Sequence, residues 1–172
     1  MTPDLHLTAR QAARVPYPGP PARALAFLRD PLVSLARVPF IKNLRLDGRR
    51  VQADLSVDVP FLGSYLLDFE SELEDAEAGA DLHARPREGR AWAEVSGSGR
   101  LIDGPTLIYD LLVTVHLNVP SGGQWGARAF TRMAEATAAA TLGRVTALFG
   151  PALIEAARED AQGAPAQRLP GR

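Results

Sequence analysis

The feature that most constrains the fold of this chain is one long amphipathic helix near its C-terminus. Between about residues 124 and 157, apolar side chains recur every three or four positions, which predicts a helix with a single apolar stripe. A helix of about 30 residues is roughly 45 Å long, enough to cross a whole small sheet. Gly150-Pro151 should kink or interrupt it, because proline removes one intrahelical hydrogen bond. The stripe consists of Phe130, Met133, Ala134, Thr137, Thr141, Val145, Leu148 and Phe149.

Most of the chain before this helix alternates between apolar and polar residues, which predicts β-strands. A first strand is expected over about residues 4–15, and two short helices follow over about residues 22–36. Six more strands follow as hairpins, with turn signals at Asp47-Gly48, Glu88-Gly89 and Asp103-Gly104. This order predicts an α+β fold in which a curved seven-stranded antiparallel sheet wraps around the long C-terminal helix.

The composition is that of a folded domain with ordinary charge. The 172 residues, 46% hydrophobic and 23% charged, predict one domain over residues 1–158. Residues 159–172 lack an apolar period and are expected to form a disordered polar tail. A net charge of −1 attracts neither nucleic acid nor anionic lipid, and the absence of cysteine excludes disulfides and thiolate chemistry. No signal-peptide block is present and no stretch approaches a membrane span, which favours a cytoplasmic protein without a membrane anchor.

Three stretches of the chain carry a family resemblance. They are the helix and Asp-Pro step at 22–31, the Gly-containing connection at 59–65, and the Gly-Ser strand with its successor at 92–115. On these stretches the chain resembles the START-like (SRPBCC) superfamily, and within it the carbon monoxide dehydrogenase G group or a bacterial family of unknown function. The resemblance implies a helix-grip fold with two short helices plugging one end. Because these are folding motifs, they imply architecture rather than activity.

The inward-facing rows of the predicted strands define a concave surface on which a ligand could bind. Gly97 and Gly99 leave room beside Tyr109 on this surface. A continuous pocket of a few hundred Å³ would support ligand binding, whereas a filled core would indicate a structural or partner-binding module; the sequence supports both. The residues expected to line a cavity are Tyr65, Leu67, Phe69, Tyr109, Leu111, Val113, Phe130, Met133 and Thr137.

Two sets of polar residues resemble metal or catalytic sites, but each has a structural explanation. Three histidines lie on different strands without a partner at metal-ligand spacing, so they are interpreted as surface residues: His6, His83 and His116. Four acidic residues share the solvent face of one strand: Asp68, Glu70, Glu72 and Glu74. They are expected to pair with Arg85 and Arg87 across a hairpin. Neither a metal site nor a carboxylate pair for catalysis is predicted.

The sequence leaves three classes of function open. The leading class is non-catalytic binding or carriage of an apolar small molecule, such as a lipid, quinone or isoprenoid-like compound, without a cofactor. The resemblance to the carbon monoxide dehydrogenase G group implies the alternative, a protein-interaction or assembly factor for a larger enzyme. The third class is a cyclase- or hydrolase-like enzyme using a cavity tyrosine or Lys42, whose strand position predicts an inward side chain with a depressed pKa.

Overall fold

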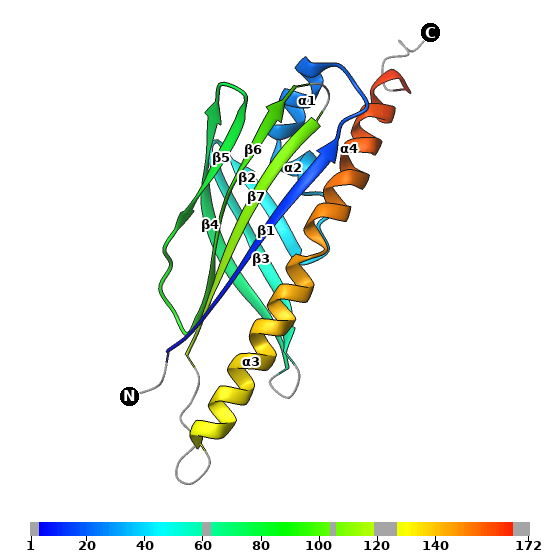
Figure 1. Ribbon diagram of the computed structural model, residues 1–172. Helices are drawn as coiled ribbons and strands as arrows, with labels where there is room; N and C mark the ends of the chain where they lie inside the picture. The colour runs from blue at the N-terminus through cyan, green and yellow to red at the C-terminus, as the bar shows by residue number, and fades with distance from the viewer. Residues whose placement is uncertain (1–3, 60–62, 104–105, 119–126, 167–172) are drawn as a thin grey trace.

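The computed structural model describes residues 4–59, 63–103, 106–118 and 127–166, and it contains a seven-stranded antiparallel sheet wrapped along a long helical segment (Figure 1). The strand order is β1-β7-β6-β5-β4-β3-β2, so β1 and β2 form the two edges. The strands are β1 (Asp4–Pro16), β2 (Ile41–Asp47), β3 (Arg50–Val59), β4 (Gly63–Ala76), β5 (Gly79–Arg85), β6 (Ala91–Ile102) and β7 (Thr106–Asn118). The predicted helix-grip architecture is confirmed.

Burial follows the predicted alternation most regularly in β7. Its inward row is buried along the whole strand: Leu107, Tyr109, Leu111, Val113, Val115 and Leu117. The β2–β3 turn consists of Gly48 and Arg49, one residue later than predicted, and Gly48 has a φ of 59°, which glycine adopts without strain. The predicted turn at Asp103-Gly104 lies partly outside the described residues.

The two short helices α1 (Pro21–Leu28) and α2 (Pro31–Ser34) lie at one end of the sheet, as expected (Figure 1). Each helix begins with proline, whose missing N–H needs no partner in a first turn. Asp30 caps α2, because its side chain accepts a hydrogen bond from the backbone N–H of Leu32 at 3.1 Å. Arg29 donates to the carbonyl oxygen of Ala76 at 2.6 Å, which ties the helical pair to the β4–β5 turn.

The long C-terminal helix is interrupted, as the Gly150-Pro151 pair predicts. It consists of α3 (Ala127–Thr146) and α4 (Phe149–Ala166), which pack along β1, and α3 also contacts β3. The break falls at residues 147–148, so that Pro151 lies in the first turn of α4, where no intrahelical partner is required.

The predicted C-terminal boundary is wrong. Helix α4 continues to Ala166, so residues 159–166 are helical rather than a disordered tail, while residues 167–172 lie outside the described residues. Tertiary contacts explain the extension. Glu159 accepts two hydrogen bonds from the Arg37 side chain, and Asp160 is bonded by Tyr17 and Arg23. The polar residues at this position therefore bind side chains in and beside the helical pair.

The helical run Arg132–Gly163 contains an 18-residue stretch that is long and apolar enough to cross a membrane, with a mean hydropathy of 1.3, which corrects the expectation that no stretch approaches a membrane span. The run covers most of α3 and α4, and its inner side is buried against the sheet at Ala138, Leu142 and Leu153. The packing identifies it as the core helix of the fold.

Candidate functional site

The concave face of the sheet carries a cavity of about 60 Å³ beneath the helical pair. Strands β4 to β7 form its floor, and α1, α2 and the first residue of α4 form its walls. Leu35, Leu73 and Leu82 are only half-buried, so the cavity approaches solvent between α2 and the β4–β5 hairpin. The apolar lining includes Leu28, Pro31, Leu35, Ile41, Phe69, Leu73, Leu82, Val95, Leu111 and Phe149.

Two glycines of β6 determine the floor of this cavity. Gly99 lies opposite Tyr109 and Gly97 lies opposite Leu111 across the β6–β7 pair. A Cβ atom on Gly99 would lie 2.7 Å from Cδ2 of Leu28 and 3.2 Å from Cε1 of Tyr109. Any larger residue at Gly99 would therefore have to displace the Leu28 side chain or the tyrosine ring, because these two side chains fill the room beside Tyr109 that the sequence predicts.

Tyr109 supplies a buried polar group to this otherwise apolar cavity. The residue is 7% exposed, and among the described residues its hydroxyl has no hydrogen-bond partner. Its ring meets the Phe149 ring edge to face, with centroids 6.0 Å apart. Burial raises the pKa of Tyr109 well above its ordinary value, and the neighbouring Ser34 lowers this pKa by a smaller amount. The group is consequently a neutral hydroxyl at physiological pH.

The two aspartates beside the cavity direct their charges away from it. Asp81 binds Arg100 at 2.6 Å, and Asp110 accepts two hydrogen bonds from Arg10. Both ion pairs belong to the outer side of the sheet, because these aspartates alternate with the inward-facing residues of their strands. The arginine beside Asp110 also lowers the pKa of that carboxyl, so it remains ionised. The cavity itself therefore has a neutral lining.

Five of the predicted lining residues border an interior space, but in two separate places. Phe69, Tyr109 and Leu111 line the 60 Å³ cavity. Tyr65 and Leu67 line a second void of about 10 Å³ beneath α3. The two spaces together are far smaller than the continuous pocket of a few hundred Å³ that the sequence analysis set as its criterion for binding, because core side chains fill most of the concave face.

The remaining predicted residues do not line either space. Val113 is buried in the packed core and Thr137 is half-buried on α3. Met133 is 58% exposed, so its prediction as a lining residue is wrong. It precedes the buried Ala138 by five residues, roughly 140° around the helix, and so lies on the outer face. The side chain of Phe130 lies outside the described residues.

Lys42 is exposed, and the prediction that it faces inward is also wrong. The register of β2 shifts between Lys42 and Arg45, where Asn43 adopts a φ of 54°. Such a bulge inserts an extra residue and reverses the alternation on one side of it. Ile41 is buried instead, so Lys42 cannot contribute a side chain to the interior.

The acidic row on β4 forms the expected ion pairs. Glu70 lies opposite Arg85 in the β4–β5 pair, and Asp68 binds Arg87 at 2.6 Å. Glu70 is more buried than a solvent-facing residue, because Arg50 and Arg87 cover it at 3.1 and 3.0 Å. The row stabilises the outer face of the sheet and contributes nothing to the cavity.

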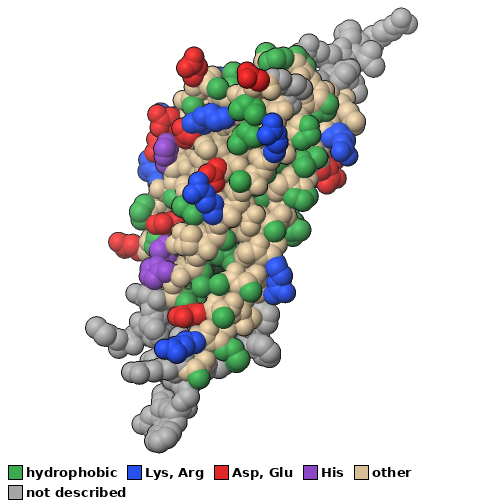
Figure 2. Space-filling model, viewed as in Figure 1, with side chains coloured by type: hydrophobic (Ala, Val, Ile, Leu, Met, Phe, Trp, Pro, Cys, Tyr) green, Lys and Arg blue, Asp and Glu red, His purple; other side chains and the backbone are tan. Residues whose placement is uncertain are grey.

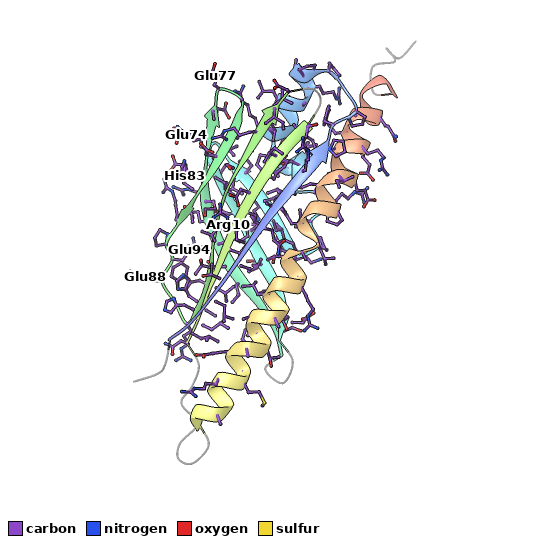
Figure 3. The ribbon with its side chains drawn as sticks, viewed as in Figure 1. Arg10, Glu74, Glu77, His83, Glu88 and Glu94 are labelled. Atoms are coloured by element: carbon purple, nitrogen blue, oxygen red, sulfur yellow. The ribbon has the colours of Figure 1, made fainter. Side chains whose placement is uncertain are left out.

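Two of the three histidines meet in an aromatic cluster that the sequence analysis missed. His6 and His116 are cross-strand neighbours with ring centroids 4.6 Å apart, and Trp92 stacks on His116 at 3.9 Å. The alternation along each strand predicts that these side chains face outward. It does not predict that they are neighbours, because that depends on the strand register. His83 and Glu94, labelled in Figure 3, also lie on the side of the sheet away from α3 and α4. Within the described ranges there is no cluster of three or more His, Cys, Asp or Glu residues that could hold a metal ion.

A larger depression lies outside the sheet, where an open groove of about 760 Å³ runs between α1 and the end of α4. Its walls include Pro18, Pro20, Phe27 and Ala161, and Arg23 and Asp160 also line it. On the face that Figure 2 shows, acidic and basic side chains are interspersed rather than gathered by sign. The groove is the larger space, but among the described residues the interior cavity is lined by a buried hydroxyl, that of Tyr109, without a hydrogen-bond partner.

The comparisons with known proteins agree with this fold. The family described as "Protein of unknown function (DUF3809)" matches residues 12–147. No curated protein matches the chain in sequence.

Among solved structures, a conserved protein from Geobacillus kaustophilus is 18% identical with a TM-score of 0.55, covering 92% of this chain and 97% of its own. The Zhui aromatase/cyclase from Streptomyces sp. R1128 is 16% identical with a TM-score of 0.54, covering 91% and 98%. Human STARD10 is 12% identical with a TM-score of 0.47, covering 96% and 67%. At these identities, the two higher-scoring likenesses show a shared fold alone.

Proposed function

Since the chain belongs to the DUF3809 family, whose description assigns no function, we propose from the site that it binds or carries an apolar small molecule without catalysing a reaction. The observation that carries the proposal is the cavity between the sheet and the helical pair α1 and α2. There Gly97, Gly99 and Ala80 present no large side chain toward the helical pair. An apolar lining with one polar group is the usual character of a small-molecule site.

The small volume of this cavity limits what binds without rearrangement. Ligand sites typically measure roughly 300–1,000 Å³, several times the 60 Å³ found here. Helix α2 has only four residues and supplies Pro31 and Ser34 to the wall. So short a helix has little stability of its own. A lipid, quinone or isoprenoid-like ligand would enter by displacing α2 from the sheet.

Native mass spectrometry of gently purified protein, followed by organic extraction, tests the proposal. We expect the wild-type protein to retain a small apolar molecule. Ala80→Val adds two methyl groups to the cavity wall and should prevent retention, whereas Ala84→Val lies on the same face of β5 outside the lining and should not. An empty wild-type protein, or equal retention by both variants, would contradict the proposal.

The alternative is a protein-interaction or assembly factor, as the resemblance to the carbon monoxide dehydrogenase G group implies. The open groove of about 760 Å³ beside α1 is the feature that favours it. In the same mass spectra, an empty protein that instead retains a defined protein partner would support this alternative. Either proposal places the protein in the cytoplasm, and the packing of α3 and α4 on the sheet supports reading the apolar helix as core rather than as a membrane anchor.

An enzyme of the cyclase or hydrolase type is the third candidate, and the aromatase/cyclase among the structural neighbours favours it. Its chemistry would fall to Tyr109, since Lys42 is exposed on the outer face. The raised pKa of Tyr109 makes the hydroxyl a hydrogen-bond donor rather than a base at neutral pH. Turnover that disappears in Tyr109→Phe would favour this candidate over simple carriage.

A further inference from the structure

We propose that the hydroxyl group of Tyr109 selects the ligand, and that the cavity takes a neutral apolar molecule with one hydrogen-bond acceptor, such as a carbonyl or ether oxygen. This inference rests on the proposed function of the cavity and names the chemical class of its ligand. It starts from the hydroxyl oxygen of Tyr109, the buried side-chain atom of the lining that has no hydrogen-bond partner among the described residues.

The hydroxyl of Tyr109 is buried and unbonded within the described part of the chain. Ser34 is the hydroxyl residue near it; its Oγ atom donates to the carbonyl oxygen of Asp30 at 3.0 Å and keeps free lone pairs, but it forms no hydrogen bond with the Tyr109 hydroxyl. A buried polar group without a partner destabilises a protein, and native structures retain few of them. The unpaired hydroxyl in this apolar cavity is therefore a place where a ligand atom could form a hydrogen bond.

Water is a poor substitute for that atom. A cavity of 60 Å³ is large enough to hold water. A buried water, however, needs two to four polar partners, and the walls are largely apolar. A molecule that fills the space with apolar groups and offers a single oxygen to Tyr109 matches the lining better.

The charge distribution restricts the ligand to neutral molecules. The carboxylates of Asp81 and Asp110 are bound by Arg100 and Arg10 on the outer side of the sheet. Neither a cation nor an anion would find a counter-charge within the cavity, and a buried unpaired charge is strongly unfavourable. Because burial also raises the pKa of Tyr109, the hydroxyl keeps its proton and can donate a hydrogen bond.

The ring of Tyr109 is held in place before a ligand arrives. Gly99 lies directly opposite it across the β6–β7 pair, and Phe149 meets it edge to face. Leu28 closes the space above Gly99. A donor whose position is already determined costs little entropy on binding and can discriminate between ligands.

Two probes of the same shape test the proposal: butanone, which carries a carbonyl oxygen, and 2-methylbut-1-ene, which carries a CH₂ group in its place. Their dissociation constants would be measured by NMR titration of the wild-type protein, of Tyr109→Phe, and of Tyr65→Phe as a matched control. Tyr65 lines the separate void beneath α3, so its hydroxyl should not affect either probe. Thermal unfolding of the three ligand-free proteins provides a second readout.

We expect Tyr109→Phe to weaken butanone binding roughly 3- to 10-fold while the alkene stays within about twofold, as the loss of one hydrogen bond predicts. The Tm of the ligand-free variant should equal or exceed that of the wild type, because the unbonded hydroxyl is gone. A lower Tm would mean that the hydroxyl is already hydrogen-bonded within the protein. Equal weakening of the binding of both probes would mean that the hydroxyl does not select the acceptor. Either result overturns the inference. If neither probe perturbs the cavity of the wild type, the proposed function fails as well.

Discussion

Gly99 is the residue on which the packing of the cavity floor most depends, because Leu28 and Tyr109 occupy the space that a side chain at this position would need. Gly99→Ala would place a methyl group 2.7 Å from Leu28, closer than carbon atoms can approach. We expect a loss of roughly 1–3 kcal/mol in the free energy of unfolding, as for other overpacked cores. Urea denaturation would measure it.

Gly143 provides the matched control for this substitution. It lies within α3, and a Cβ atom there would meet nothing within 4 Å. Gly143→Ala should raise the free energy of unfolding by roughly 0.5–1 kcal/mol, because alanine loses less backbone freedom than glycine in a helix. If the two alanine variants had the same stability, the crowding at Gly99 would be disproved.

Tyr17 links the alkaline stability of the protein to the end of α4. It is fully buried, and its hydroxyl donates to Oδ2 of Asp160 at 2.6 Å. Burial, together with the Asp160 carboxylate, raises the pKa of Tyr17 to about 12. Because this folded-state pKa exceeds the unfolded value of about 10, the associated stability is complete below about pH 10 and is lost as the pH rises through about 12.

Tyr17→Phe removes both the hydrogen bond and this titration. At neutral pH we expect the variant to be less stable by roughly 1.5–3 kcal/mol, as for hydrogen bonds to charged groups. The difference from the wild type should narrow as the pH rises above about 10. Urea denaturation between pH 7 and pH 11 tests this, and a difference that stays constant would show that Tyr17 titrates normally in the folded protein.

At the scale of single elements, the sequence does not show unambiguously which side of α3 packs on the sheet. Alanine occurs on every side of this helix, so Met133 fits the apolar period although it is 58% exposed, as does Leu148 in the break after α3, at 49%. The strands were easier to predict, because a period of two leaves one choice of inner face. In β2 that rule fails only where the bulge at Asn43 reverses it.

Alanine substitutions at Leu142 and at Met133 should differ in their effect on the free energy of unfolding, because only Leu142 packs on the sheet. Leu142 is 1% exposed, so Leu142→Ala should lower the free energy of unfolding by roughly 2–5 kcal/mol and speed amide hydrogen exchange in α3 more than in α4. Met133→Ala, on the outer face, should change it by no more than about 0.5 kcal/mol. A larger effect at Met133 than at Leu142 would mean that the helix packs by the other face.

For the whole molecule, element order alone predicted the sheet, the helical pair and the interrupted helix, because each follows from local periodicity or a proline. The site was predicted in part. Phe69, Tyr109 and Leu111 share an inward parity and meet in the cavity, whereas the wall residues of the helical pair, such as Leu28 and Ser34, follow from how the pair docks on the sheet. Cavity size depends on interdigitating side chains, which periodicity does not describe.

The central claim is that the space beneath the helical pair is an apolar ligand site, and xenon tests it most directly because a xenon atom binds empty apolar cavities without needing a hydrogen bond. Methyl NMR spectra of the protein under xenon pressure should show saturable shifts confined to the cavity lining, including Leu28, Val95 and Leu111. Ala80→Val should abolish these shifts and Ala84→Val should leave them intact. Unchanged spectra, or shifts confined to Val33 in the outer groove, would contradict the account.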